Sequence, residues 1–489
     1  MRSVFLLAVG FCLFTVPFSA FGALEKAAKK PNILFICADD LKPLMGAYRN
    51  AKAETPNFDR LAASGTTFTK AVCNIPVCGA SRASIMTGLR PTSQRFLDWD
   101  SRVDKDAAEA ADLAGHLKAG GYHARNIGKI LHFPDDRADS WSVAPWRPDY
   151  PDPNGPQVNW RDYKTIENQT IAAQHENGRA LPWEKAEVSD DTYYDGQIAA
   201  KAVEFLKSDE AKNGPFFLGL GFLKPHLPFN APAKYWDLYD PKSFELPETY
   251  ARTEGAPKVA YHNFGELRSY YGVPEKGPLP DAMALRLMHG YHACVSYVDA
   301  LLGRVLDTLE QEHLAENTVI VLWGDHGFNL GDHQLWCKHA NFYSSLQVPL
   351  IIVDPRQEQP RAEVDDVVEL IDVFPTLCEV AGVAAPPLPG RSLVPFLTAP
   401  ETENPLREPG GAALSAWKGG LTVTTPDFAF TEWFNKKGQA WAKMLFDHRS
   451  NQLEAENIAE EEESKLIING LRELRQKRLQ PVVQPIAQP

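Results

Sequence analysis

Short continuous apolar runs recur along the chain, and amphipathic segments separate them. Such runs are typical of strands that a parallel sheet buries on both faces. They occupy residues 33–37, 216–220, 319–323 and 349–353. Apolar residues have helical spacing between them, at 57–63, 107–119 and 284–313. Because strands alternate with helices, the pattern predicts an α/β domain with a large mixed, mostly parallel sheet flanked by helices.

The pattern changes beyond residue 405. A segment rich in Pro and Gly lies at 405–411, and shorter alternating segments follow it at 421–424, 428–433 and 443–447. Alternation of this kind indicates an antiparallel sheet, and a charged helix is predicted at 460–478. We therefore predict a main α/β domain at 31–405, a small C-terminal α+β subdomain at 410–480 and a disordered tail at 481–489.

The first residues carry a separate pattern. An apolar run extends from Val4 to Pro17, and small residues surround Gly22. The run is too short to span a bilayer comfortably, and polar residues follow it at once. This pattern predicts a signal peptide at 1–22 and a secreted or periplasmic protein. We expect no membrane span in the rest of the chain, because no later stretch is long and apolar enough.

Charge and cysteine spacing limit the classes of partner. The formal net charge of −13 argues against a sequence-independent grip on nucleic acid or anionic lipid. A site for an anionic substrate must therefore gather its cations locally. The seven cysteines lack the spacing of a disulfide scaffold or a zinc site. Most of them are expected to be small buried apolar residues.

Two acidic clusters stand where predicted strands end. Asp39 and Asp40 follow the first apolar run, and Asp325 and His326 follow the third. In open α/β sheets, ligands collect beyond the carboxyl ends of the strands. Each cluster alone is also compatible with a turn, since Asp is a common turn residue. Two clusters at equivalent strand ends favour a metal site, and their oxygen donors favour calcium or magnesium over zinc.

The segment VCGASRASIMTG places Cys78 at the start of a short apolar helix. Alone, such a cysteine is also compatible with a packed thiol. The segment resembles the sulfatase signature, in which Cys-x-Pro/Ala-x-Arg is followed within a few residues by Thr-Gly. Ala80 stands where Pro is commoner, and Leu89 separates Gly88 from Arg90 where Gly-Arg is usual. In that family a maturation enzyme oxidises the cysteine to formylglycine, so the resemblance implies this conversion at Cys78.

The resemblance extends along nearly the whole chain and is closest to the iduronate-2-sulfatase branch of the family. The matching stretches are PNILFICADDL, AVCNIPVCGASRASIMTGLRP, NIGKILH, GFLKPHLPF, WGDHGFNLGDHQLWCKHANF and LFDHRSNQLEAENIA. The resemblance implies a sulfuric ester hydrolase with the alkaline-phosphatase-like sulfatase fold, one calcium ion (Ca2+) and a formylglycine nucleophile. It also implies the metal ligands Asp39, Asp40, the formylglycine made from Cys78, Asp325 and His326. Many sulfatases have Asn at the last position, whereas this branch has His.

Cations and histidines from separate segments match the remaining family positions. By resemblance, Arg82 orients the hydrated formylglycine, and Lys129 and Lys338 hold the sulfate oxygens as charge develops. His132 matches the base that restores the aldehyde. His226 matches the group beside the leaving oxygen, which it or Lys338 protonates. Each is also compatible with a surface lysine or a hydrogen-bonded histidine, but together they supply the local cations that an anionic substrate requires.

The resemblance implies a sulfated carbohydrate as substrate, and a 2-O-sulfated uronate in a polysaccharide is our hypothesis. Trp99 and Phe328 flank the expected site, where an aromatic ring either stacks on a sugar or belongs to the core. Two other functions stay open. One is a phosphodiesterase or phosphonate hydrolase of the same superfamily, which a second metal site would favour. The other is a catalytically silent glycan-binding protein with an unmodified Cys78.

Overall fold

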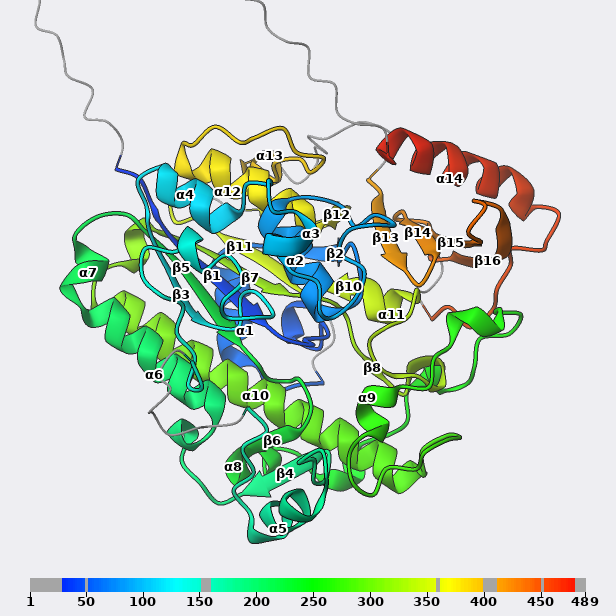
Figure 1. Cartoon of the computed structure of the whole chain (residues 1–489), viewed down its shortest axis with the longest axis horizontal. Helices are drawn as coiled ribbons and strands as arrows, with labels where there is room; N and C mark the ends of the chain where they lie inside the picture. Colours follow the sequence, from blue (N-terminus) through cyan, green and yellow to red (C-terminus); the bar gives the residue numbers. More distant parts are fainter. Residues whose placement is uncertain are drawn as a thin grey trace, which may run out of the picture. The chain divides into compact units, whose positions relative to one another are not determined.

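The computed structural model describes residues 29–48, 52–150, 160–357, 361–398, 411–449 and 453–479, and a mixed sheet lies at its centre (Figure 1). Within these residues the sheet consists of β1 (Asn32–Ala38), β2 (Thr66–Val72), β3 (His123–Gly128), β5 (Phe216–Phe222), β7 (Thr318–Gly324), β10 (Gln347–Val348), β11 (Leu350–Val353) and β12 (Glu363–Glu369). The strand order is β10-β2-β11-β7-β1-β5-β3, and β12 pairs with β2.

Most strands of this sheet run in the same direction. β1 is parallel to both β5 and β7, and β3 is parallel to β5. β11 is antiparallel to its neighbours β7 and β2, although its apolar run is like those of the parallel strands. A continuous apolar run indicates burial on both faces and carries no information about direction. The prediction of a mixed, mostly parallel sheet is confirmed.

Helices cover both faces of the central sheet (Figure 1). Leu34 and Ile36 of β1 pack into an apolar cluster on one face, and Ile33 and Phe35 pack into a second cluster on the other. Side chains alternate across a strand, so only a continuous apolar run can bury both faces. The first cluster includes α1 (Pro56–Ala63), α6 (Tyr194–Lys207) and α10 (Asp281–Gln311); the second includes α2 (Cys78–Thr87), α4 (Leu113–Ala119) and α12 (Val373–Ala381).

The loops beyond the sheet carry short elements. Two small sheets pair β4 (Trp183–Ala186) with β6 (Phe229–Pro232), and β8 (Asn329–Leu330) with β9 (Trp336–Cys337). Among the described residues, the other α-helices before the C-terminal sheet are α3 (Val103–Asp106), α5 (Ile166–Gln174), α7 (Asp209–Lys212), α8 (Ala233–Trp236), α9 (Gly265–Arg268), α11 (Tyr343–Leu346) and α13 (Val394–Thr398).

A small antiparallel sheet with one helix follows the main sheet in sequence, as predicted. It contains β13 (Ala413–Trp417), β14 (Gly420–Thr424), β15 (Phe428–Phe434) and β16 (Ala440–Asp447), and α14 (Ser464–Leu479) packs beside it. The sequence did not predict β13. This strand joins the main sheet's loops, because the Asn74 side chain donates to the Leu414 carbonyl at 2.9 Å and the Ala416 N–H donates to the Asn74 carbonyl at 2.9 Å.

Several predicted boundaries differ from the structure or lie outside it. The helix expected at 107–119 begins only at Leu113, because Asp112 accepts a hydrogen bond from the Gly115 N–H at 3.0 Å and caps a new start. The signal peptide (1–22) and the tail (481–489) lie outside the described residues. None of the described helices is long and apolar enough to cross a membrane.

Candidate active site

The carboxyl ends of four parallel strands meet at one edge of the central sheet. Ligands bind at this edge in open α/β folds. The strands are β1, β3, β5 and β7, and the segments that follow them carry predicted site residues. These residues are Asp39 and Asp40 after β1, Lys129 and His132 after β3, His226 after β5, and Asp325 and His326 after β7.

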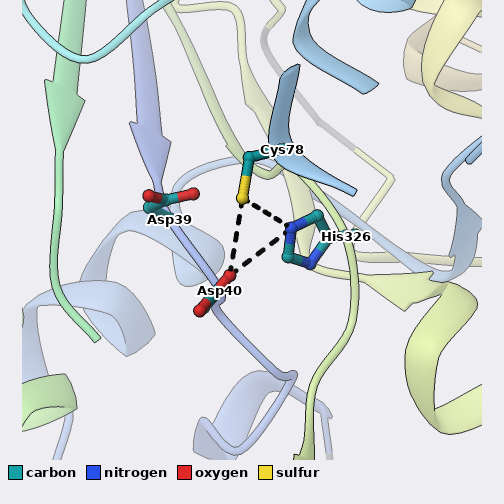
Figure 2. Close-up of side chains that lie close together, drawn as sticks. All are labelled: Asp39, Asp40, Cys78 and His326. Atoms are coloured by element: carbon teal, nitrogen blue, oxygen red, sulfur yellow. Dashed lines mark hydrogen bonds and ion pairs between the residues drawn. The ribbon is translucent and has the colours of Figure 1, made fainter. Parts of the chain in front are cut away.

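Figure 2 shows Asp39, Asp40, Cys78 and His326 in one buried cluster. One potential ligand atom from each lies within 4.8 Å of the others. The Cys78 Sγ lies 3.2 Å from the His326 Nε2 and 4.0 Å from the Asp40 Oδ1. Asp325 adjoins them, with its Oδ2 3.7 Å from the His326 Nε2. The structure therefore brings together all five residues expected at a metal site.

The donor atoms of this cluster suit a hard divalent cation. The His326 Nδ1 lies 2.9 Å from the Gly327 carbonyl oxygen, so Nδ1 carries the proton and Nε2 presents its lone pair to the cluster. Asp39, Asp40 and Asp325 are fully buried. Carboxylate oxygens are the ligands that calcium prefers, and the imidazole nitrogen is the least usual member of this set.

Cations contact the carboxylates of the cluster. Arg82 donates from Nη2 to the Asp39 Oδ1 at 3.1 Å and from Nε to the Asp325 Oδ2 at 2.9 Å. Lys129 donates to the second oxygen of Asp39. Burial raises the pKa of Asp39, but Lys129 and Arg82 outweigh burial and hold that pKa well below its usual range. Burial and the charge of Asp39 raise the pKa of Asp325.

Lys338 joins Asp40 to Glu266, a carboxylate that the sequence did not reveal. The Lys338 Nζ lies 3.0 Å from the Asp40 Oδ2 and 2.9 Å from the Glu266 Oε2. Asp40, His226 and Glu266 are themselves close enough to hold an ion. The Lys338 ammonium bridges two of them, Asp40 and Glu266. Glu266 lies in the short helix α9, outside any recognisable motif, so no local pattern could have identified it.

His226 faces acceptors at both ring nitrogens. Its Nδ1 lies 2.7 Å from the Leu227 carbonyl oxygen, and its Nε2 lies 3.0 Å from the Glu266 Oε1. Burial raises the pKa of Glu266, but Lys338 and His226 outweigh burial and hold it well below the usual range. Because Glu266 is then an acceptor only, both ring nitrogens of His226 face acceptor oxygens.

Cys78 is the first residue of α2, and the extended Val77 precedes it. Arg82 follows one turn later on the same side of the helix. Gly79 permits a close approach, because a Cβ there would lie 1.9 Å from the Trp99 carbonyl oxygen. Burial and the charge of Asp39 raise the pKa of the Cys78 thiol. The unmodified thiol thus stays protonated and is a weak nucleophile.

Cys78 lines a cavity of about 490 Å³, together with His132, His226 and Lys338. Lys129 lines a smaller cavity of about 140 Å³ that shares both histidines with the larger one. Burial and the charge of Lys129 lower the pKa of His132 to about 2. Its imidazole is therefore neutral at physiological pH and can accept a proton. Lys129, Lys338, His132 and His226 thus line two cavities that share both histidines, whereas Arg82 is fully buried and lines neither.

The structure separates the two aromatic residues that were considered for sugar stacking. Trp99 lines the larger cavity and is 55 % exposed. Phe328 is buried, and its ring stacks on Tyr291 with centroids 5.3 Å apart, so it belongs to the core. Trp160 also lines the larger cavity, although its sequence context did not distinguish it from other tryptophans.

Comparison with known families identifies this arrangement. A family model described as sulfatase matches residues 31–383, which is well over half of the chain. The chain belongs to the sulfatase family. The sulfatase also matches a model of the C-terminal region of N-sulphoglucosamine sulphohydrolase over residues 331–480. The predicted family, its alkaline-phosphatase-like fold and the class of sulfuric ester hydrolase are confirmed.

Two relatives are similar in sequence to about three quarters of this sulfatase or more. A sulfatase of Formosa agariphila is 33% identical over 399 residues, which cover 79% of this chain and 76% of that protein. The iduronate 2-sulfatase of Mus musculus is 31% identical over 407 residues, which cover 75% of this chain and 72% of the mouse protein.

Solved structures share the fold over almost the whole sulfatase. A phosphonate monoester hydrolase from Silicibacter pomeroyi superimposes with a TM-score of 0.71 at 22% identity, covering 94% of this chain and 97% of that one. A protein in complex with its substrate D-glucosamine-2-N,6-O-disulfate gives a TM-score of 0.70 at 22% identity, covering 94% and 100%. At this identity the two likenesses establish the fold alone.

Proposed function

We propose that this sulfatase hydrolyses the sulfate ester of a carbohydrate, with formylglycine at residue 78 and one calcium ion beside it. The observation that carries the proposal is the position of Cys78. Its Sγ lies 3.2 Å from the His326 Nε2 and 4.0 Å from the Asp40 Oδ1, and the same residue lines the cavity of about 490 Å³. One side chain therefore contacts both the expected metal ligands and the space for a substrate.

Asp39, Asp40, Asp325 and His326 are the residues that would hold calcium. Their buried carboxylates and the lone pair of Nε2 form the donor set described above. When bound, the ion and the hydrated formylglycine supply positive charge and a nucleophilic hydroxyl for attack on sulfur. Conversion of Cys78 requires a formylglycine-generating maturation enzyme as a partner.

The remaining residues bind the sulfate group and move protons. Lys129 and Lys338 line the cavities and attract the non-bridging oxygens as their charge increases. His226 lines the same cavities and donates a proton to the leaving oxygen. The neutral His132 accepts the proton that is released at residue 78. Arg82 orients this end of the site through its bonds to the buried carboxylates.

We infer that the substrate is a 2-O-sulfated uronate within a polysaccharide or its oligosaccharides. The likeness to mouse iduronate 2-sulfatase supports this choice. The exposed face of Trp99 suits stacking on a sugar ring, and a cavity of about 490 Å³ is large enough for a small ligand. The signal peptide predicted at 1–22 supports a secreted or periplasmic enzyme, which would meet such a substrate outside the cytoplasm.

Two measurements on protein made together with the maturation enzyme test the proposal. Mass spectrometry of the tryptic peptide that contains residue 78 should find formylglycine in place of cysteine. The same protein should release sulfate from uronate 2-sulfate oligosaccharides, and Cys78→Ala protein should release none.

Other outcomes would favour the alternatives. Activity confined to aryl or choline sulfates would contradict the carbohydrate substrate. Faster hydrolysis of a phosphodiester or phosphonate ester than of any sulfate would favour the related hydrolases. An unmodified thiol without sulfate release, in protein from the native host, would leave glycan binding as the better explanation.

A further inference from the structure

Two arginines line the larger cavity beyond the residues that the sulfate group requires. Arg161 and Arg179 line the same cavity as Cys78 and Lys338. They flank α5 in sequence and lie far from the signature segment. Neither arginine belongs to the group of residues proposed to act at sulfur. Their position raises the question whether they recognise a part of the substrate other than the sulfate ester.

Aromatic rings support both guanidinium groups. The Arg161 guanidinium lies 4.2 Å from the centroid of the Trp160 ring, and the Arg179 guanidinium lies 5.5 Å from that of Tyr270. Burial raises the pKa of Tyr270, while the charges of Arg161 and Arg179 both lower it. Both charges are thus close to one buried ring, and the two arginines form a single cationic patch.

Hydrogen bonds hold the segment that carries Arg179. The Asn177 side chain accepts from the Arg179 N–H at 3.0 Å and donates to the Ser269 carbonyl at 3.1 Å. The Ala180 carbonyl accepts from the Tyr271 N–H at 3.0 Å. Arg179 therefore stands on a fixed backbone beside the cavity, which reduces the entropy lost when its guanidinium binds a ligand.

The cavity has more positive than negative charge among its described lining residues. Among these lining residues the carboxylate is that of Glu266. Its Oε1 lies 3.0 Å from the His226 Nε2, and its Oε2 lies 2.9 Å from the Lys338 Nζ. Among the described residues Arg179 forms no ion pair, and its buried Nε has no hydrogen-bond partner. A guanidinium with unused donors in a protein of net charge −13 is suited to an anionic ligand.

We propose that Arg161 and Arg179 bind a second anionic group of the substrate, separate from the sulfate ester that is cleaved. This inference rests on the proposed function and deepens it. The second group is an oxyanion on the same or the neighbouring sugar, either a carboxylate or another sulfate. The enzyme is therefore selective for sugars with at least two anionic groups. A purely structural arginine, stacked on its ring for packing alone, would confer no such selectivity.

Kinetics on matched substrates test this selectivity. The wild type, Arg179→Ala, Arg161→Ala and Arg179→Lys proteins are compared on four sulfate esters. Uronate 2-sulfate supplies a carboxylate, glucosamine 2-N,6-O-disulfate supplies a second sulfate, and galactose 6-sulfate and 4-nitrophenyl sulfate supply neither. Arg304→Gln is the control, because Arg304 pairs with Asp191 at 2.6 Å outside the cavity.

We expect each alanine variant to lose about 10- to 100-fold in kcat/KM on the dianionic sugar, mainly through KM. On the two monoanionic esters the change should stay within about 3-fold, and Arg179→Lys should recover part of the loss. The dianionic sugar with the higher wild-type kcat/KM identifies the second group as carboxylate or sulfate. Equal losses on all four esters, no loss on any, or wild-type preference for the monoanionic esters would overturn the proposal.

Binding separates this inference from the proposed reaction. Titration calorimetry of Cys78→Ala protein with glucosamine 2-N,6-O-disulfate and uronate 2-sulfate measures affinity without hydrolysis. If the wild type releases no sulfate, the proposed function fails. The affinity of Cys78→Ala protein should still fall about 10-fold or more when Arg179→Ala is added. Unchanged affinity for both sugars would refute the arginine site whether or not sulfate is released.

Discussion

Asp39, Asp40 and Asp325 are buried close together at the candidate site, and each carboxylate is paired with a different set of cations. Asp39 and Asp325 are joined by the guanidinium of Arg82, whereas Asp40 contacts the Lys338 ammonium. Buried carboxylates in such proximity repel one another unless a positive charge lies close by. The carboxylates make this site suitable for a divalent cation, and the neighbouring lysines make it suitable for a sulfate group. Electrostatic balance at single residues is thus the basis of the proposed chemistry.

Removal of calcium is predicted to abolish activity and lower stability. Dialysis of the mature protein against a calcium chelator should stop sulfate release, and added calcium should restore it better than magnesium, which requires stricter geometry. At calcium concentrations about 100 times Kd, bound ion stabilises the fold by about 2.7 kcal/mol. Differential scanning calorimetry with and without calcium measures this effect. An unchanged melting temperature and full activity after chelation would contradict the metal site.

Glu266→Gln is predicted to impair proton donation without unfolding the protein. The substitution removes the negative charge that contacts His226 at 3.0 Å and Lys338 at 2.9 Å. We expect kcat on an oligosaccharide sulfate to fall about 10- to 100-fold with a small change in KM. A substrate whose leaving group needs no proton, such as 4-nitrophenyl sulfate, should be affected much less. Glu275→Gln, at an exposed position, is the matched control.

Equal losses on both substrates would contradict this role for Glu266. They would indicate that the carboxylate only positions Lys338 for sulfate binding. Circular dichroism and the thermal midpoint of the variant should match those of the control.

At the scale of elements, the start of α2 determines where Cys78, the proposed nucleophile, lies. The helix begins at Cys78 and ends where Gly88 adopts φ 66°. Its first turn packs against the backbone of the loop at Trp99, a contact that only glycine at position 79 allows. The signature segment therefore specifies the position of a helix as well as the residue proposed to react.

Gly79→Ala is predicted to displace residue 78 from the metal ligands. The new Cβ would lie 1.9 Å from the Trp99 carbonyl oxygen, so the loop or the helix must move. Overpacking of this kind costs about 1–3 kcal/mol of stability, and we expect sulfate release to fall at least about 10-fold. Gly470→Ala in α14 is the control, because nothing lies within 4 Å of its Cβ position. Normal activity of Gly79→Ala protein would refute this explanation.

At the scale of the whole molecule, one buried carboxylate joins the central sheet to the C-terminal sheet and helix. Glu369, the last residue of β12, accepts from Arg90 Nη2 at 2.5 Å and from the Leu414 N–H at 2.9 Å. The Arg478 Nη1 of α14 lies 3.4 Å from the Glu369 Oε2, the oxygen that Arg90 Nη2 also contacts. Burial raises the pKa of Glu369, but Arg90 outweighs burial and lowers that pKa overall.

Glu369→Ala is predicted to cost about 3–5 kcal/mol at neutral pH, because it leaves Arg90 buried without its partner. A carboxyl whose pKa is lowered by folding stabilises the protein above its unfolded pKa of about 4.3 and loses this contribution as pH falls through the folded pKa. The difference from wild type should therefore shrink in acid. Urea unfolding near pH 7 and near pH 3 measures it.

Glu460→Ala is the control for this experiment, because the ion pair that Glu460 forms within the described residues is an exposed one, with Lys443 at 3.4 Å. We expect a change below about 1 kcal/mol. A comparably small effect at Glu369 would contradict the role of this residue in joining the two sheets.

Local patterns were enough to predict much of the fold and of the site. Continuous apolar runs located β1, β5, β7 and β11, because burial on both faces leaves no room for polar side chains. Acidic residues directly after β1 and β7 predicted the metal site, since parallel strands end at one edge. The signature around Cys78 predicted the sulfatase family, which the comparisons confirm. Each of these inferences depends on residues that are close in sequence.

Only the tertiary structure revealed what separate loops contribute. The antiparallel direction of β11 depends on chain connections that an apolar run does not encode. Glu266 of the short helix α9 and the pair Arg161 and Arg179 reach the cavity from segments without periodicity or motif, so their partners could not be inferred. Phe328 follows the metal cluster in sequence but packs in the core. Sequence alone therefore determined four strands of the main sheet and the sulfatase family, because short-range patterns specify them. The surroundings of the substrate were decided by long-range packing of loops, which leaves no local pattern.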